Sequence, residues 1–157
     1  MSTIALREAS FPADGGSVSS LLGDYLRQTE AEKVERGLAP RADELPEHYW
    51  REVADPAASL NGMRVLMARV DGEDCGIVVV ANSASGSEIK RFWTTPPARG
   101  RGVGSALMDE ALRLASRPVR LSVWQWREPA IRMYRNLGFV TAAPWDEREQ
   151  LLCLELG

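Results

Sequence analysis

The sequence predicts a single α/β (α+β) domain built around one mixed sheet of about seven strands, flanked by about four helices. Apolar runs of strand length alternate with segments of helical periodicity, in the order β–α–α–β–β–β–α–β–α–β–β. An Asp-Gly dipeptide between two of the strand-like runs indicates a hairpin. The 157 residues contain no internal repeat or linker, and this length suffices for one domain with its own core.

The amino-terminal part predicts one short strand followed by helices. Residues 4–7 alternate in the manner of a strand. A helix beginning at Asp14 places its apolar side chains on one face, at Val18, Leu21, Leu22, Tyr25 and Leu26. Residues 28–55 are polar and interrupted by glycine and proline, so we expect one or two short helices there, at about 29–37 and 46–54.

The rest of the chain predicts most of the sheet. The runs RVLMARV at 64–70 and CGIVVVA at 75–81 flank the turn DGED. Further strands are expected at residues 88–94, 119–124, 139–142 and 150–156, and further helices at 103–116 and 129–137. Gly138 would stop the last helix.

Composition narrows the classes of function. A net charge of −3 and a pI near 5.3 argue against a nucleic-acid footprint. Residues 1–61 carry −5 and residues 62–157 carry +2, which suggests an anionic ligand on the second part and a cationic one on the first. There is no apolar run of membrane length, no secretory pattern and no CxxC pair, so we expect a cytoplasmic protein without a metal or a membrane partner.

A glycine-rich segment carries the clearest chemical signal. Residues 91–108 read RFWTTPPARGRGVGSALM, with Gly100, Gly102 and Gly104 between a strand and a helix. Bare glycines expose the unpaired N–H groups of a helix start, which bind phosphate, and two neighbouring arginines add positive charge. A Rossmann fingerprint would need glycine where Ser105 stands, and a Walker A loop would need a lysine. A tight turn that serves only helix packing remains the alternative.

This segment resembles the coenzyme A loop of the GNAT superfamily of N-acetyltransferases. Arg99, Gly102 and Gly104 match its motif Q/R-x-x-G-x-G/A. The stretch LSVWQWREPAIRMYRNLGF at 121–139 resembles the motif that follows it, and together the likeness covers about residues 64–142. The resemblance implies a mostly antiparallel sheet and acetyl-CoA as co-substrate. It also implies a division into a variable acceptor-side part at 1–61, a cofactor-binding core at 62–142 and a closing strand at 143–157.

The resemblance also implies where the co-substrate and the reacting groups lie. The expected cofactor-binding residues are Trp93, Thr94, Arg99, Gly100, Arg101, Gly102, Val103, Gly104 and Ser105. Tyr134 corresponds to the family's general acid, although it could instead be a core aromatic. Glu88, thirteen residues before Arg101, is the candidate general base, with His48 or water as alternatives. Arg127 stands where the family often has asparagine, and it could reach a phosphate or point to solvent.

These residues predict an enzyme that moves an acetyl group from acetyl-CoA to a primary amine by direct attack, through a tetrahedral intermediate. The acidic first part favours a cationic small molecule or a protein amine as acceptor. A non-catalytic acyl-CoA-binding sensor and a generic anion-binding domain remain the alternatives. Closing strands often pair between subunits in this family, which leaves a homodimer open.

Overall fold

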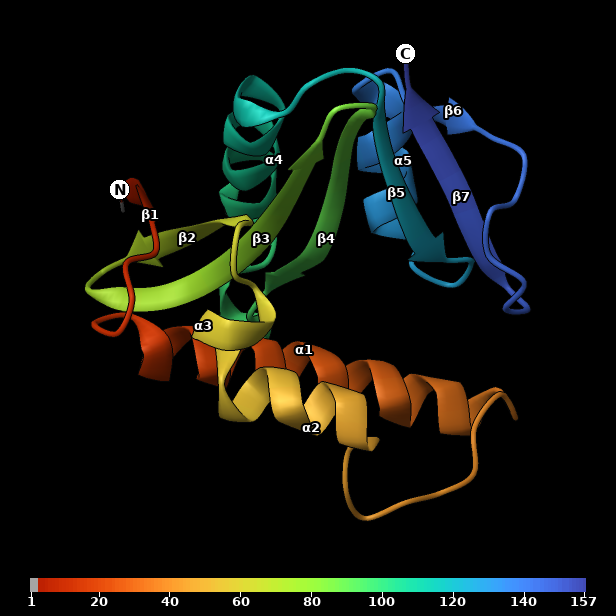
Figure 1. Cartoon of the computed structure of the whole chain (residues 1–157), viewed down its shortest axis with the longest axis horizontal. Coiled ribbons are helices and arrows are strands. Elements are labelled where there is room, and N and C mark those ends of the chain that lie inside the picture. The colour runs from red at the N-terminus through yellow and green to blue at the C-terminus, as the bar shows by residue number, and fades with distance from the viewer. Residues whose placement is uncertain (1–2) are drawn as a thin grey trace.

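One seven-stranded sheet organises the chain in the computed structural model, which describes residues 3–157 (Figure 1). The strand order is β1-β2-β3-β4-β5-β7-β6; only the β4–β5 pair is parallel. The strands are β1 (Ile4–Glu8), β2 (Arg64–Val70), β3 (Glu73–Ser83), β4 (Gly86–Thr94), β5 (Val119–Trp124), β6 (Val140–Thr141) and β7 (Leu151–Leu156). The helices are α1 (Gly15–Glu35), α2 (Glu47–Ala54), α3 (Pro56–Ser59), α4 (Val103–Leu114) and α5 (Glu128–Asn136), with a 3-10 turn, η1, at Pro96–Ala98. The predicted fold class is confirmed.

Alternating side chains of the central strands build two cores, one on each face of the sheet. Val65 and Met67 of β2 pack with α1, whereas Leu66 and Ala68 pack with α4. In Figure 1, α1, α2 and α3 form one layer, and α4 and α5 lie apart from it. Because both faces are covered, β2 and β3 read as continuous apolar runs.

The helical part before β2 differs from the expectation in one respect. Residues 29–35 continue α1 instead of forming a second helix, since no glycine or proline interrupts the chain between Gly23 and Gly37. The helix predicted at 46–54 is confirmed as α2. The short α3 was not predicted; the Asp55 carboxylate caps it by accepting a hydrogen bond from the Ala58 N–H at 3.3 Å. Within residues 3–157, no helix has the length and apolarity needed to cross a membrane.

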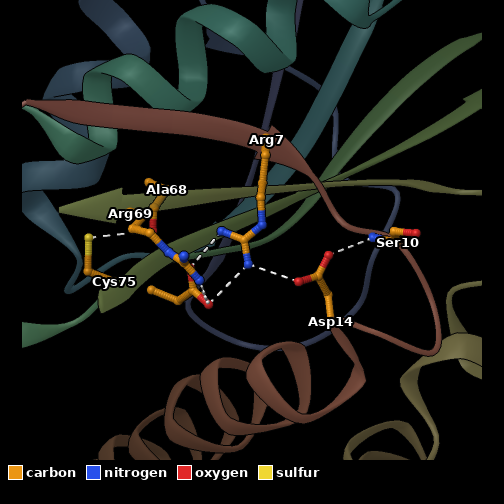
Figure 2. Close-up of polar contacts among 7 residues, drawn as sticks. Arg7, Ser10, Asp14, Ala68, Arg69 and Cys75 are labelled. Carbon is orange, nitrogen blue, oxygen red and sulfur yellow. Dashed lines mark hydrogen bonds and ion pairs between the residues drawn. The ribbon is translucent and has the colours of Figure 1, made fainter. Parts of the chain in front are cut away.

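The predicted hairpin holds the first strand and the first helix in place. Asp71 and Gly72 form its two-residue turn at φ +52° and +81°, so β3 begins at Glu73 and includes Asp74. Arg7 of β1 donates to Asp74 at 2.7 and 3.1 Å and to Asp14, next to the start of α1, at 2.9 Å (Figure 2). The hydrogen bonds from Arg7 hold the pKa of Asp74 well below its usual range.

Candidate active site

The site begins where β4 and β5 separate. Their parallel pairing is confined to two registers, Ser87 with Val119 and Glu88 with Arg120. Farther along, the β3–β4 ladder shifts register around Arg91, which has a φ of +55°. A bulge of this kind bends its strand and increases the twist. The last residues of β4 therefore diverge from β5 and leave an opening between the two strands, visible in Figure 1.

The glycine loop follows β4 through η1 and leads directly into α4. Gly100 and Gly102 have φ values of +76° and +84°, which L-residues rarely adopt, and Gly102 is the N-cap residue of α4. A Cβ on Gly104 would lie 3.1 Å from the Phe92 ring, so this glycine lets α4 approach β4 closely. The first turn of α4 therefore presents backbone N–H groups beside the end of β4.

A groove of about 830 Å³ runs along this helix start between β4, α1 and α5. Of the nine expected cofactor-binding residues, seven line it: Trp93, Thr94, Arg99, Gly100, Gly102, Gly104 and Ser105. The other two do not. Val103 is buried in the core, and the Arg101 guanidinium lies 3.6 Å from the Asp71 carboxylate.

Arg99 is the charged group of the groove best suited to an anion. It packs on the Trp93 ring at 4.7 Å and donates to the Thr94 carbonyl at 3.1 Å. It forms no ion pair with any residue of the part described. Partial burial, together with the nearby Arg127 charge, lowers its pKa. A cation in this environment gains from an anionic ligand, which would offset both effects.

A second cavity, of about 340 Å³, lies on the other side of the opening. Its walls come from α1, α2, β4, β5 and the segment before β7, and they include Tyr25, Tyr49 and Trp124. Phe92, Arg127 and Ala130 line both this cavity and the groove. The two spaces therefore meet at these three residues, between the separated strands.

Tyr134 lies close to this junction. The side chain is 5% exposed and packs against Phe92 and Phe139, with ring centroids 6.2 and 5.9 Å away. It lines the second cavity. Burial raises the pKa of its hydroxyl, so the group stays protonated throughout the neutral range. A protonated hydroxyl beside the junction can donate a hydrogen bond or a proton.

The two base candidates line the same cavity, and both are exposed to solvent. Glu88 stands four residues before Phe92, or about 13 Å along the strand, so only water could relay a proton to it. His48 lies on α2, and its ring is tilted by 45° against that of Tyr49, with the ring centroids 3.9 Å apart.

Arg127 does not point to solvent, since its side chain is 17% exposed and binds α1. Its guanidinium donates to the Glu32 carboxylate at 2.9 and 3.2 Å and to the Thr29 hydroxyl at 2.7 Å. Glu32 also accepts from Trp126 Nε1 at 2.8 Å and from Gln28 at 2.8 Å. Burial alone would raise the Glu32 pKa, but these donors and the Arg127 charge together lower it. This carboxylate therefore joins α1 to the start of α5.

Sequence reasoning missed Glu32 and a second buried pair. Arg91, at the bulge, donates to Glu52 of α2 at 2.7 and 2.9 Å, and Glu52 is 8% exposed. Burial alone would lower the Arg91 pKa, but the carboxylate reverses this and raises it. A helix-period pattern marks Glu52 as surface, and only the packing of α2 on the sheet shows otherwise. No local signal could have found either carboxylate.

The glycine-bared start of α4 beside two separated strands defines a site for a phosphate-bearing ligand, and comparison with known proteins gives the family. The family model described as an acetyltransferase (GNAT) domain matches residues 61–141, about half of the chain. The chain therefore belongs to the GNAT acetyltransferase family, as its two motifs predicted.

Curated relatives match in part. An uncharacterized N-acetyltransferase, MJ1207, of Methanocaldococcus jannaschii is 33% identical over 70 residues, covering 42% of this chain and 31% of the relative. An IAA acetyltransferase of Azospirillum brasilense is 29% identical over 89 residues, covering 53% of this chain and 58% of the relative. The matches thus span about a third and less than three fifths of these relatives.

Solved structures share the fold over nearly the whole chain. The PaiA N-acetyltransferase of Thermoplasma acidophilum, in complex with coenzyme A, has a TM-score of 0.68 at 19% identity, with 98% of each chain covered. YncA of Salmonella typhimurium, with its cofactor acetyl-CoA, has a TM-score of 0.62 at 20% identity, covering 98% of this chain and 92% of that one. At these identities the likeness concerns the fold alone.

Proposed function

We propose that this chain is an N-acetyltransferase that moves the acetyl group of acetyl-CoA to a primary amine. The observation that carries the proposal is the meeting of two cavities at Phe92, Arg127 and Ala130, because a two-substrate transfer needs two binding spaces with one shared point. Family membership and the two ligand-bound neighbours support acetyl-CoA as the donor.

The groove fits the donor by its chemistry. The first turn of α4 and the unpaired Arg99 suit a pyrophosphate. Beyond the bulge, Trp93 and Thr94 line the groove, and an extended pantetheine arm there would pair with their backbone. A backbone N–H at this point would stabilise the oxyanion of the tetrahedral intermediate, a contribution of about 2.7–4 kcal/mol in other enzymes.

Direct attack by the amine accounts for the groups around the junction. The thioester supplies an activated acetyl group, and the chain orients the two reactants and manages the protons. Tyr134 donates toward the departing sulfur. Since a thiol has a pKa near 8.5 and burial raises that of Tyr134, the hydroxyl acts chiefly as a hydrogen-bond donor to the developing thiolate. Glu88 takes up the amine proton through water.

The expected preference for a cationic acceptor loses its basis. Of the acidic residues within residues 3–61, Glu30 alone lines the second cavity, and it lies 2.7 Å from the ammonium group of Lys33. The excess negative charge of the first part is therefore located elsewhere. The proposed acceptor remains a primary amine. We also propose a cytoplasmic location, where the two buried free cysteines would stay reduced, and a homodimer.

Calorimetry with acetyl-CoA tests the donor site, with ATP and NADPH as controls. Arg99→Gln should weaken binding by about tenfold or more, since it removes a charge-assisted contact. Arg101→Gln is the matched control, because Arg101 does not line the groove and its loss should leave affinity nearly unchanged. Absence of saturable binding to a folded sample would reject the proposal.

Turnover separates an enzyme from a sensor. Release of free thiol from acetyl-CoA in the presence of an amine panel should be seen with the wild type. It should fall strongly in Tyr134→Phe while acetyl-CoA affinity is retained. Binding without turnover for every amine in the panel would favour a non-catalytic acyl-CoA sensor.

A further inference from the structure

The second cavity has more cationic than anionic groups on its walls. Four basic side chains line it, namely Lys90, Arg91, Arg127 and Arg148, against two acidic ones, Glu30 and Glu88. Its volume of about 340 Å³ is at the lower end of ligand pockets, which hold about 300–1,000 Å³. The space therefore suits one small molecule that has a negatively charged group.

Two of these arginines form ion pairs with carboxylates that lie outside the cavity lining. Glu52 accepts from Nε and Nη2 of Arg91, and Asp146 accepts from Nε and Nη2 of Arg148 at 3.0 and 2.8 Å. Neither carboxylate lines the cavity. A guanidinium held along its Nε–Nη2 edge still has the Nη1 amino group to donate. For Arg91, Nη1 has no partner in residues 3–157.

Aromatic faces keep the cations together over the cavity. The Arg91 guanidinium lies 5.6 Å from the Tyr49 ring, and the Arg148 guanidinium lies 5.6 Å from the Trp124 ring. The Lys33 ammonium lies 6.0 and 5.6 Å from the same two rings. The Lys90 ammonium group forms no ion pair or hydrogen bond within the part of the chain described. Because Glu52 and Asp146 already fix Arg91 and Arg148, these side chains lose little conformational entropy when they bind a ligand. This favours the binding of an anion in the cavity.

We infer that the acceptor is an amino carboxylate, that is, an amino acid or a close relative. Its carboxylate would lie against Arg91, Arg148 and Lys90, and its amino group would point to the junction at Phe92. The Nη1 amino group of each arginine can donate to a carboxylate oxygen, and the rings of Tyr49 and Trp124 suit an apolar or aromatic side chain. The inference rests on the proposed function.

The reaction balances without a further reagent. The neutral amine nitrogen forms a bond to the thioester carbonyl carbon, and the carbon–sulfur bond breaks. One proton leaves the nitrogen through water, and one proton joins the sulfur. The products are an N-acetyl amino acid and free coenzyme A.

Matched acceptors test the carboxylate. We would compare kcat/KM for each of the twenty amino acids, the amides of the best ones and the corresponding decarboxylated amines, with spermidine and a short peptide as further arms. The best amino acid should exceed both its amide and its decarboxylated amine by about tenfold or more, as expected for a charge-assisted contact. Equal rates for the three forms, or turnover confined to spermidine or the peptide, would overturn the inference and leave the acetyltransferase proposal intact.

Variants locate the effect. Arg148→Gln and Lys90→Gln are chosen because Arg148 is half exposed and Lys90 is unpaired, so neither change leaves a buried charge alone. Each should reduce the ratio of kcat/KM between acid and amide severalfold. Arg113→Gln, on α4 and outside both cavities, should leave that ratio unchanged. A ratio unaffected by both cavity variants would also overturn the inference.

A binding measurement keeps the two proposals separable. Titration of the N-acetyl form of the best amino acid should quench tryptophan fluorescence, since Trp124 lines the cavity. The methyl ester of the same compound should bind about tenfold more weakly. If acetyl-CoA fails to bind, the proposed function fails, whereas this titration still reports on the carboxylate site. Equal binding of acid and ester would refute that site.

Discussion

Neutralising Glu32 is the most direct test of how α1 shapes the donor groove. Glu32→Gln keeps the shape of the side chain but removes the charge that Trp126 and Arg127 bind, and the side chains of Glu32 and Arg127 are 20% and 17% exposed. A hydrogen bond to a charged group contributes about 1.5–3 kcal/mol and a neutral one about 0.5–1.5. For two donors, we therefore expect the free energy of unfolding to fall by about 2–3 kcal/mol.

Thermal unfolding at pH 7 should show this loss as a decrease in Tm of about 4–12 °C for a domain of this size. Since the fold lowers the Glu32 pKa from an unfolded value of 4.5, its stabilisation is present above that pH and is lost as pH falls through the folded value. The difference in Tm between wild type and variant should accordingly narrow below about pH 4.5. Acetyl-CoA affinity should fall too, because Trp126 and Arg127 line the groove.

Glu35→Gln is the control for this experiment. Its side chain lies one turn farther along α1 and is 75% exposed, and among residues 3–157 its carboxylate pairs only with Arg36, at 3.7 Å. An exposed pair of this kind contributes little, so Tm should change by no more than about 2 °C. If Glu32→Gln lowered Tm no more than Glu35→Gln, or if the decrease in Tm stayed the same in acid, the inference that the Glu32 carboxylate joins α1 to the start of α5 would be refuted.

Three further predictions concern the scaffold and the chemistry. Asp74→Asn should lower the free energy of unfolding by about 2–3 kcal/mol at pH 7. Because the fold lowers the pKa of this carboxyl, the difference from the wild type should disappear in acid, and chemical denaturation over a pH series measures it. Gly102→Ala should cost about 1–2 kcal/mol and weaken acetyl-CoA binding, since its φ is +84°, whereas Gly16→Ala, which has open space and no positive φ, should not. Glu88→Gln should lower kcat/KM by about 10²-fold, the lower end of general-base catalysis, because its proton transfer runs through water; an unchanged pH-rate profile would contradict this.

The parts of the fold that were predictable are those whose signals are local. Apolar runs of strand length located all seven strands, and the Asp71-Gly72 dipeptide located the hairpin, although β3 begins at Glu73 rather than at Cys75. The glycine loop was predictable because positive φ values at Gly100 and Gly102 require that residue type. Contacts between residues far apart in the sequence were not predictable. Glu32 binds Arg127 across 95 positions, and Glu32 lies in the part of α1 where the sequence predicted a separate helix.

The second cavity shows more clearly that contacts between distant residues could not be predicted from the sequence. Charge counted along residues 1–61 predicted a cationic ligand, but burial and pairing decide which charges face a cavity. Glu52 is among those acidic residues, yet it lies beneath Arg91 and serves to hold that guanidinium in place. An acidic segment can therefore build a site for an anion, provided that its carboxylates support arginines from behind.

Arg91 joins the two halves of the site. Its positive φ costs about 1–2 kcal/mol relative to an ordinary strand conformation, and glycine would avoid that cost. Glycine, however, would leave the Glu52 carboxylate buried without a partner, at a cost of about 3–5 kcal/mol, so the ion pair outweighs the strain. The same residue thereby maintains the bulge that separates β4 from β5 and presents a fixed guanidinium to the second cavity. Arg91 thus contributes both to the separation of β4 from β5 and to the positive charge of the second cavity, and under the proposed function it would couple the geometry of the transfer to the choice of acceptor.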